Sequence, residues 1–288
     1  MQTMQSAAAG FLLDIAQAQN AELNAAGQMA SGLRFTQPSQ DPSGAGTAVI
    51  LDAQSQQQSR WQSATTAAGA WGSATDTALQ QALNVLQQVR SNTVQGANGS
   101  LNANEFSDTA NVVTQLQQQL LQIANSQFEG LYLFAGQKVT TQPYPSPTAT
   151  YAGDTASITF EIGPGMKSSP SVNGTVFGTA MATVTQVISD LSSGNVTALG
   201  GTDLQKVDQA LASIEAVQGG LGATESGIQL QKTSLSGQSQ GVQTDLASIQ
   251  NVNMANESVA YSEAAQALQA ALTVTSQAMP QSIFKYLQ

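Results

Sequence analysis

Apolar residues recur three and four positions apart over long stretches of this chain, which is the spacing of a helix with one apolar face. The first ladder lies within residues 5–33, with Ile15 and Met29 beside it. Its members are Leu12, Ala16, Gln19, Leu23, Ala26, Ala30 and Leu33. Because several of these are Ala or Gln, the predicted coiled-coil seam is thin and needs a partner helix.

The same spacing predicts further helices. A second helix covers residues 46–93, a break follows at 96–99, and a third helix covers 103–127, so that the two form an antiparallel hairpin. Helix resumes near Met181. From Asp203 onward a strict seven-residue series indicates one long helix in a coiled coil. The series consists of Ile214, Leu221, Ile228, Leu235, Val242 and Ile249.

A last ladder runs to the end of the chain, after the pattern shifts around residues 250–257. It consists of Tyr261, Ala265, Leu268, Leu272, Thr275 and Met279. Because both ends of the chain carry seamed helices, we expect them to pair as an antiparallel coiled coil. Both seams are thin, so we expect these helices to be poorly ordered alone and to be stabilised by neighbouring subunits.

A turn rich in glycine and proline, residues 29–48, separates the first two helices. Gln37 and Asp41 precede prolines and favour extended backbone. Either Asp41, with Pro42 as first helical residue, or Ser43 is suited to cap the second helix. Arg34 and Asp41 either form an ion pair that braces this turn or are both simply solvated. An ordinary helix–loop–helix connection is the alternative interpretation of the stretch.

The middle of the chain has a different character. Residues 128–136 are apolar and read as a strand that leaves the helices, and residues 139–178 hold five of the eight prolines. Within them, residues 158–162 alternate as a half-buried strand does. The run 163–165 predicts a turn, and Asn173-Gly174 predicts a tight hairpin turn.

These patterns predict a mainly α fold, an elongated helical bundle of long coiled-coil helices from both termini with a small central β-rich insert. We expect three parts. Residues 1–45 with 250–288 form a terminal coiled-coil segment, 46–138 with 179–249 a helical body, and 139–178 the β-rich insert.

Composition excludes several kinds of chemistry. The 288 residues include no cysteine and no histidine, which removes disulfides, thiolate nucleophiles and the commonest zinc ligands. The net charge is -10 and the eight basic residues are scattered, so no basic patch for nucleic acid is visible. No apolar run approaches the length of a membrane span. The start lacks a basic region, so we expect no cleaved signal; cytosolic residence and export without a cleaved signal both fit.

An enzyme is the hypothesis of another class. Pairs such as Asp203 with Asp208, or Asp14 with Glu22, have the composition of an acid–base dyad, but nothing places them in a pocket. No phosphate loop or nucleophile elbow is present, and no cofactor is expected. We therefore expect a structural protein and no catalysis.

Five stretches resemble flagellin-related axial proteins, above all the hook–filament junction proteins known as flagellar hook-associated protein 3. Residues 28–34 (QMASGLR) with 37–42 (QPSQDP) are similar to that family's S-G-K-R and P-S-D-D-P signature. The other stretches are 86–95, which resembles the hairpin-top motif shared with flagellins; 130–136 (GLYLFAG); 151–154 (YAGD) with 174–177 (GTVF); and 282–287 (SIFKYL). The chain departs from the pattern at Leu33, where the family usually has Lys, and its tail at 278–281 has a flagellin character.

The resemblance implies a subunit of a bacterial flagellum, exported through the flagellar type III apparatus without signal cleavage and held beforehand by a chaperone at its C-terminal region. Its partners would be copies of itself in a ring, hook-associated protein 1 on one side and flagellin on the other. Flagellin itself is the alternative. A coiled-coil tip or translocator of another secretion system would lack the stretches at 37–42 and 130–136.

Assembly would then depend on packing of the terminal helices. Burial of each large apolar side chain contributes about 1.5–3 kcal/mol, against an ordering cost of about 1–2 kcal/mol per residue. Ordering of the terminal helices should therefore depend on neighbours. The expected assembly residues are Leu12, Ile15, Leu23, Arg34, Pro38, Asp41, Pro42, Arg90, Tyr261, Leu268, Leu272, Met279, Ile283, Phe284 and Leu287.

Overall fold

The chain divides into two compact units. A computed structural model describes the backbone of residues 2–284 and the side chains of residues 9–277. The first unit joins the N-terminal stretch up to Gln57 with the C-terminal stretch from Ser239, and the second spans Gln58–Gln238. Helices α2 (Pro42–Ala97) and α6 (Leu204–Gln250) contribute residues to both units.

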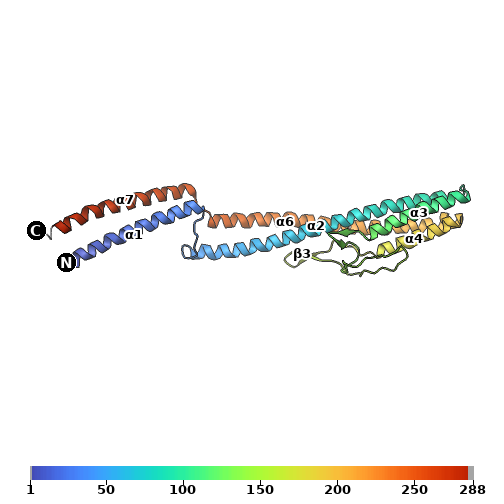
Figure 1. The fold of residues 1–288 in the computed structure, drawn as a ribbon, viewed down its shortest axis with the longest axis horizontal. Helices are drawn as coiled ribbons and strands as arrows, with labels where there is room; N and C mark the ends of the chain where they lie inside the picture. The colour runs from blue at the N-terminus through green and yellow to red at the C-terminus, as the bar shows by residue number, and fades with distance from the viewer. Residues whose placement is uncertain (1, 285–288) are drawn as a thin grey trace. The chain divides into compact units, whose positions relative to one another are not determined.

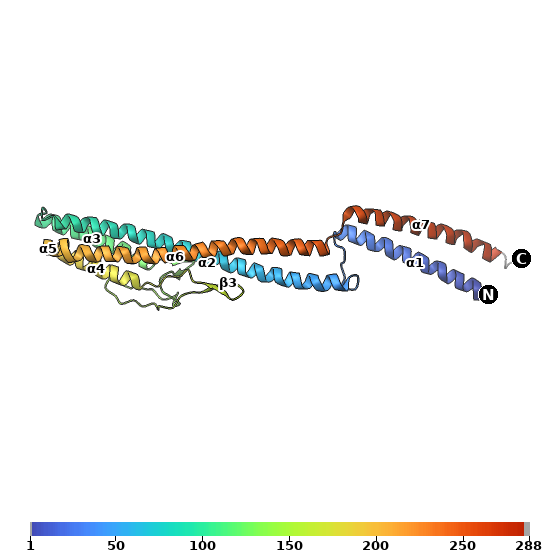
Figure 2. The ribbon, with the colours of Figure 1, turned by 180° about the vertical axis from the view of Figure 1, so that it is seen from behind.

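The first unit is built on α1 (Gln2–Ser31) and α7 (Met254–Phe284), which lie side by side and run antiparallel (Figures 1 and 2). The antiparallel pairing predicted from the two ladders is therefore confirmed. The shift in the heptad pattern is also confirmed, because the helix is broken at residues 251–253, between α6 and α7.

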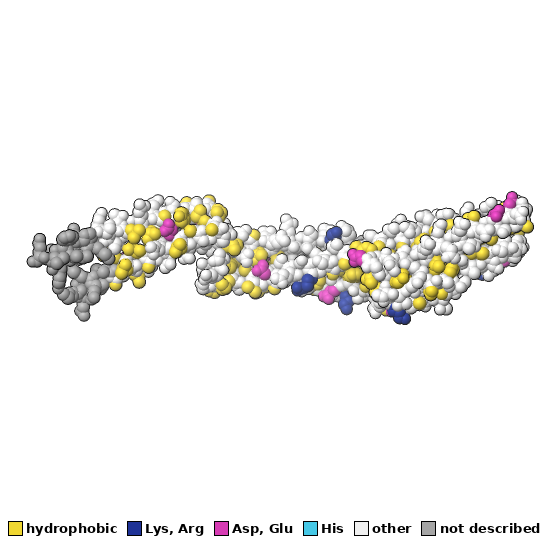
Figure 3. Space-filling model, viewed as in Figure 1, with side chains coloured by type: hydrophobic (Ala, Val, Ile, Leu, Met, Phe, Trp, Pro, Cys, Tyr) yellow, Lys and Arg dark blue, Asp and Glu magenta, His cyan; other side chains and the backbone are white. Residues whose placement is uncertain are grey.

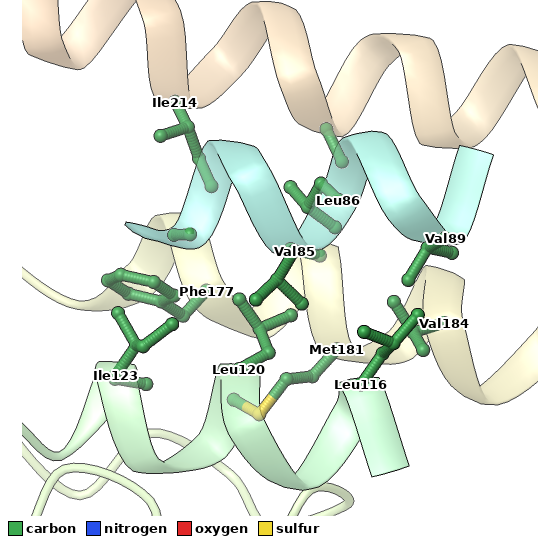
Figure 4. Close-up of a cluster of buried hydrophobic side chains, with 14 of the residues drawn as sticks. Val85, Leu86, Val89, Leu116, Leu120, Ile123, Phe177, Met181, Val184 and Ile214 are labelled. Carbon is green, nitrogen blue, oxygen red and sulfur yellow. The ribbon is translucent and has the colours of Figure 1, made fainter. Parts of the chain in front are cut away.

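The second unit packs α2 and α6 with α3 (Ala103–Ala124) and α4 (Thr175–Ser192) around one apolar core (Figure 4). Four helices contribute to it. Figure 4 labels Val85, Leu86 and Val89 of α2, Leu116, Leu120 and Ile123 of α3, Phe177, Met181 and Val184 of α4, and Ile214 of α6, all of them buried. Since side chains from the four helices interlock at one place, this unit has the core that α1 and α7 lack.

Local signals explain where its helices begin. Asn102 caps α3 by accepting hydrogen bonds from the backbone N–H groups of Asn104 and Glu105, and the Glu105 carboxylate accepts from the N–H of Asn102. This reciprocal arrangement satisfies donors that a helix start leaves free. After α4 come the short α5 (Val196–Ala198) and a π-helical turn, η1 (Leu199–Asp203), which leads into α6.

The β structure consists of two small antiparallel hairpins. In the first, β1 (Gln127–Phe128) pairs with β2 (Leu131–Tyr132). In the second, β3 (Phe160–Gly163) pairs with β4 (Met166–Ser168) across a turn in which Gly165 has φ +68°. The rest of the insert is irregular chain.

The mainly α fold with a small β-rich insert is confirmed, and three local predictions are wrong. Residues 128–136 form a tight hairpin and a turn because Glu129 and Gly130 both have positive φ. Asn173-Gly174 is no hairpin turn but the start of α4, which begins at Thr175 and not near Met181. The strand predicted at 158–162 is confirmed as β3, with its bounds shifted to Phe160–Gly163. The division into three parts stays a prediction.

Among the described residues, no helix has the length and apolar character that a membrane crossing requires.

Candidate assembly surface

The turn between α1 and α2 is held by backbone hydrogen bonds to the break between α6 and α7. The N–H of Arg34 donates to the Gln250 carbonyl at 2.6 Å, and the N–H of Val252 donates to the Gly32 carbonyl at 3.0 Å. Leu33 and Asn251 form an isolated antiparallel bridge. Gly32 has φ +70°, a conformation that glycine adopts without strain. Two segments more than two hundred residues apart in sequence thus form one junction.

Asp41 organises this turn with both of its carboxylate oxygens. One oxygen accepts a hydrogen bond from the Gly44 N–H at 2.8 Å, which caps α2, and the other lies 2.6 Å from Nη2 of Arg34. The Gly44 hydrogen bond is the largest influence and lowers the pKa of Asp41; burial opposes it, and the contact with Arg34 adds to the lowering. Of the two predicted caps, Asp41 is the observed one, with Pro42 as first helical residue, and the predicted ion pair is present.

The Asp41 cap explains the glycine at position 44. A Cβ there would collide with the Asp41 carboxylate and would lie 3.0 Å from Cε1 of the buried Phe35. Pro38 is exposed, and the Gln40 side chain closes the loop around it by accepting from the N–H groups of Thr36 and Gln37.

Helices α1 and α7 meet through a face other than the predicted seam. The α1 residues turned inward include Phe11, Ile15, Ala18, Glu22, Ala25 and Met29, and Ala26 of the predicted ladder is half-buried as well. The first six follow the same alternation of three and four positions, shifted by one residue from the expected ladder. Among the described side chains of α1 and α7, only Ala25 is fully buried, at 6% exposure.

The predicted ladder of α1 lies mostly on the outside. Leu12 is 59% exposed and Leu23 is 69% exposed, with Leu13 beside them at 61%. Ile15, which we placed beside the ladder, belongs to the inner face. The prediction that Leu12 and Leu23 form the contact between α1 and α7 is therefore wrong, because both lie on the face that α7 does not cover.

The ladder of α7 is divided between inside and outside. Ala265, Leu268 and Thr275 are half-buried, whereas Tyr261 and Leu272 are exposed. Met279, Ile283, Phe284 and Leu287 lie outside the residues whose side chains the structure describes.

Exposed apolar side chains gather over the first unit, where Figure 3 shows yellow along the described parts of α1 and α7. They include Leu12, Leu13, Leu23, Val49, Ile50, Met254, Val259, Tyr261, Leu272 and Val274. We call this set the outer apolar surface. Large exposed apolar patches in soluble proteins are typical of interaction sites.

Arg90 is engaged within the second unit. Its Nε lies 2.6 Å from Oδ1 of Asp208, which joins α2 to α6 at a half-exposed ion pair. Asp208, one of the carboxylates considered from the sequence, is thus paired with a basic side chain.

The GLYLFAG stretch lies in the second unit, where it attaches the insert to the helices. Leu133, Phe134 and Ala135 are buried, and the Tyr151 hydroxyl donates to the Phe134 carbonyl at 2.7 Å. A Cβ on Gly136 (φ +69°) would collide with the backbone of Asp154. In this structure the stretch packs the insert against the helices of the second unit.

Sequence reasoning missed Tyr144 of the insert. The Tyr144 hydroxyl is buried and donates to the Gly174 carbonyl at 2.8 Å, just before α4 begins. Burial raises the pKa of Tyr144 to about 12. Asn125, at the end of α3, exchanges two hydrogen bonds with the Tyr144 backbone. Only its position in a proline-rich segment marked Tyr144 in the sequence.

A buried carboxyl pair was also missed. Asp203 is 1% exposed, and burial together with the neighbouring Asp190 raises its pKa to about 6. Asp190 accepts hydrogen bonds from Gln186 (2.6 Å) and Asn195 (2.9 Å), and chiefly the Gln186 contact lowers its pKa. Within the described residues no group of three or more carboxylates is arranged to hold a metal ion.

Two family descriptions match this chain. Residues 3–139 match the bacterial flagellin N-terminal helical region, and residues 204–287 match the bacterial flagellin C-terminal helical region. Together the two regions span most of the chain, with the insert and α4 between them. The chain belongs to the flagellin-related axial proteins. Within that family it is similar to flagellar hook-associated protein 3 of Salmonella typhimurium, with 28% identity over 194 residues, 65% of this chain. The alignment spans 58% of that relative.

Solved structures of flagellin-related proteins share the fold. FlgL of Bacillus cereus has 21% identity and a TM-score of 0.62 over 69% of this chain and 99% of its own. A putative flagellar hook-associated protein of Vibrio parahaemolyticus has 19% identity and a TM-score of 0.65 over 74% of this chain and 100% of its own. Flagellar hook-associated protein 3 of Legionella pneumophila has 15% identity and a TM-score of 0.63, covering 69% and 98%.

Proposed function

We propose that this chain is a structural subunit of the bacterial flagellum, the adaptor at the hook–filament junction. Its partners are copies of itself, hook-associated protein 1 and flagellin. The similarity to hook-associated protein 3 and the GLYLFAG stretch favour this role over that of a filament subunit.

One observation carries the mechanism. Helices of 30 and 31 residues have a single fully buried residue, Ala25, among their described side chains, while Leu12, Leu23 and Leu272 face outward. Since most helix stability in proteins comes from packing of an apolar face, this pair is incomplete alone. Full burial of each exposed leucine in an assembly contributes about 1.5–3 kcal/mol.

Assembly then proceeds by packing of the outer apolar surface against the terminal helices of neighbouring subunits. The ion pair between Arg34 and Asp41 and the backbone bonds to residues 250–252 fix the junction from which α1 and α7 extend. The function requires no catalysis and no cofactor. Export without a cleaved signal, with a chaperone at the C-terminal region, completes this proposal.

Deletion of the gene in its own bacterium tests the role. The expected result is loss of swimming, hooks without filaments, and flagellin monomer in the medium, because export continues while the filament has no platform. Normal motility would contradict the proposal. Complementation with the wild-type chain is the control.

Flagellin is the second candidate, and the two flagellin family matches favour it. The same strain separates the two roles. Loss of filaments with no flagellin in the medium means that the deleted chain was itself the filament subunit.

A further inference from the structure

A groove in the second unit lies between α2 and the two β hairpins. It has a volume of about 530 Å³, within the range of sites that hold small ligands. The apolar residues around it are Ala67, Trp71, Phe128, Leu131, Val139, Ile158 and Phe160. Five of them, Phe128, Leu131, Val139, Ile158 and Phe160, are half-buried and pack against the main core of the second unit.

Three aromatic rings line this groove, and two of them are perpendicular. Trp71 and Phe128 stand edge to face, with centroids 6.0 Å apart and planes at 83°, and Phe160 lines the same groove. Aromatic faces attract cations through their quadrupole, and sites built from several rings bind alkylated ammonium groups.

The charge at the groove has the matching sign. Glu129 is the only charged residue that lines it; the other polar lining residues are Gln137 and Thr159. Glu161, the next carboxylate along β3, does not line the groove and pairs in register with Lys167. A carboxylate beside aromatic rings disfavours anions and favours organic cations.

The backbone also marks Glu129. It has φ +52°, and among the described residues it is the only non-glycine residue with a positive φ. Asn or Asp before glycine is the usual choice in such a hairpin turn. A strained glutamate kept at the rim of a binding groove is typical of a functional position.

We propose that this groove binds a small organic cation of the alkylammonium class. The alkyl groups contact Trp71, Phe128 and Phe160, and the positive charge lies next to the Glu129 carboxylate. The site is independent of the terminal helices and of the junction role.

A pair of matched ligands tests the proposal on the full-length protein. Choline and its neutral carbon analogue, 3,3-dimethylbutan-1-ol, have nearly the same shape and differ in charge. In ligand-observed NMR titrations we expect choline to bind about tenfold more tightly, the scale of one cation–π and carboxylate contact. Equal affinity, or no binding of choline, would overturn the proposal.

Variants place the effect at the groove. Glu129→Gln keeps the size of the side chain and should remove most of the preference for choline, while Glu161→Gln, on the neighbouring strand, should leave it unchanged. Phe160→Leu keeps an apolar side chain and should weaken choline more than the neutral analogue. Equal effects of Glu129→Gln and Glu161→Gln would contradict the assignment.

A fourth variant separates binding from folding. Glu129→Gly removes both the charge and the backbone strain, so it should raise the midpoint of thermal unfolding while it weakens choline binding. If this variant retained the choline preference, Glu129 would have no role in binding and the proposal would fail.

Discussion

At the scale of single residues, Asp203 is buried where its ionised form is unfavourable. Both of its carboxylate oxygens are buried, and neither has a hydrogen-bond partner among the described atoms. Asp190 (α4) and Lys206 (α6) are the charged groups that act on it, the first raising and the second lowering its pKa. The protonated form of Asp203 is therefore the one that the folded state prefers.

This preference predicts a pH dependence of stability. Because the pKa of Asp203 is about 6 when folded and near 3.8 when unfolded, the folded state holds the extra proton between these values. The free energy of unfolding should thus fall as pH rises from 4 to 6, by up to roughly 2–3 kcal/mol for this one group. Urea unfolding of the wild type and Asp203→Asn at several pH values measures it.

Asp203→Asn should lack this fall and should be the more stable protein at pH 7.5. Asp190→Asn is a second check, because loss of this neighbouring carboxylate removes part of the rise in the Asp203 pKa and should reduce the fall in stability between pH 4 and 6. Identical pH profiles for wild type and Asp203→Asn would contradict the prediction.

Two glycines at the start of α2 give a second prediction at this scale. Gly46 has open space where a Cβ would be placed, so Gly46→Ala should stabilise the helix by about 0.5–1 kcal/mol. Gly44→Ala should destabilise the protein instead, because its methyl group displaces the Asp41 carboxylate from its cap and from Arg34. Thermal unfolding of the two variants, followed by circular dichroism, should shift in opposite directions.

At the scale of elements, α1 shows how far hydrophobic spacing predicts structure. Leu12 with Leu23, and Ile15 with Ala25, belong to two overlapping ladders with the same alternation of three and four. Both ladders carry large apolar residues, and we expected the ladder with Leu12 and Leu23 to contact α7. In the structure Leu12 and Leu23 face outward, and spacing alone does not say which partner covers a face.

The α6 series was predicted correctly for a physical reason. Ile214, Leu221, Ile228, Leu235 and Val242 are all buried, and Ile249, the last member, is half-buried. A strict seven-residue spacing keeps these positions on one side of a helix. The β hairpin at 127–132 was missed because Glu-Gly is a rare turn pair. The long-range contacts, such as Arg90 with Asp208, have no local signal in the sequence.

The two faces of α1 predict opposite effects of substitution. Leu12→Ser with Leu23→Ser changes exposed positions, so the thermal unfolding of the monomer should stay unchanged, while complementation of motility should be lost. Ile15→Ala is the contrast on the inner face and should loosen the contact between α1 and α7. Wild-type motility in a strain with the double variant would show that the outer apolar surface makes no assembly contact.

At the scale of the whole molecule, the two units should differ in stability. The second unit has an apolar core built from four helices. Among the described side chains of α1 and α7, only Ala25 is buried. Brief proteolysis of the isolated protein should therefore remove the terminal helices first and leave a fragment close to residues 58–238, because local opening exposes them to cleavage.

Mass spectrometry of the digest identifies that fragment, and circular dichroism should show more helix in the assembled state than in the monomer. Full-length protein that resists the protease as well as the 58–238 fragment does, with equal helix in both states, would contradict conditional ordering of the termini.

The antiparallel pairing of α1 and α7 has a practical consequence for labelling. Because α1 and α7 run antiparallel, the first turn of α1 lies beside the last turn of α7, so a fluorescent or affinity tag at either terminus is joined to the helices that carry most of the outer apolar surface. The β3–β4 turn is a better insertion point, since Gly165 has no atom within 4 Å of the position of an added side chain. A short tag inserted there should leave assembly intact, whereas a tag at a terminus should interfere with the packing of the terminal helices.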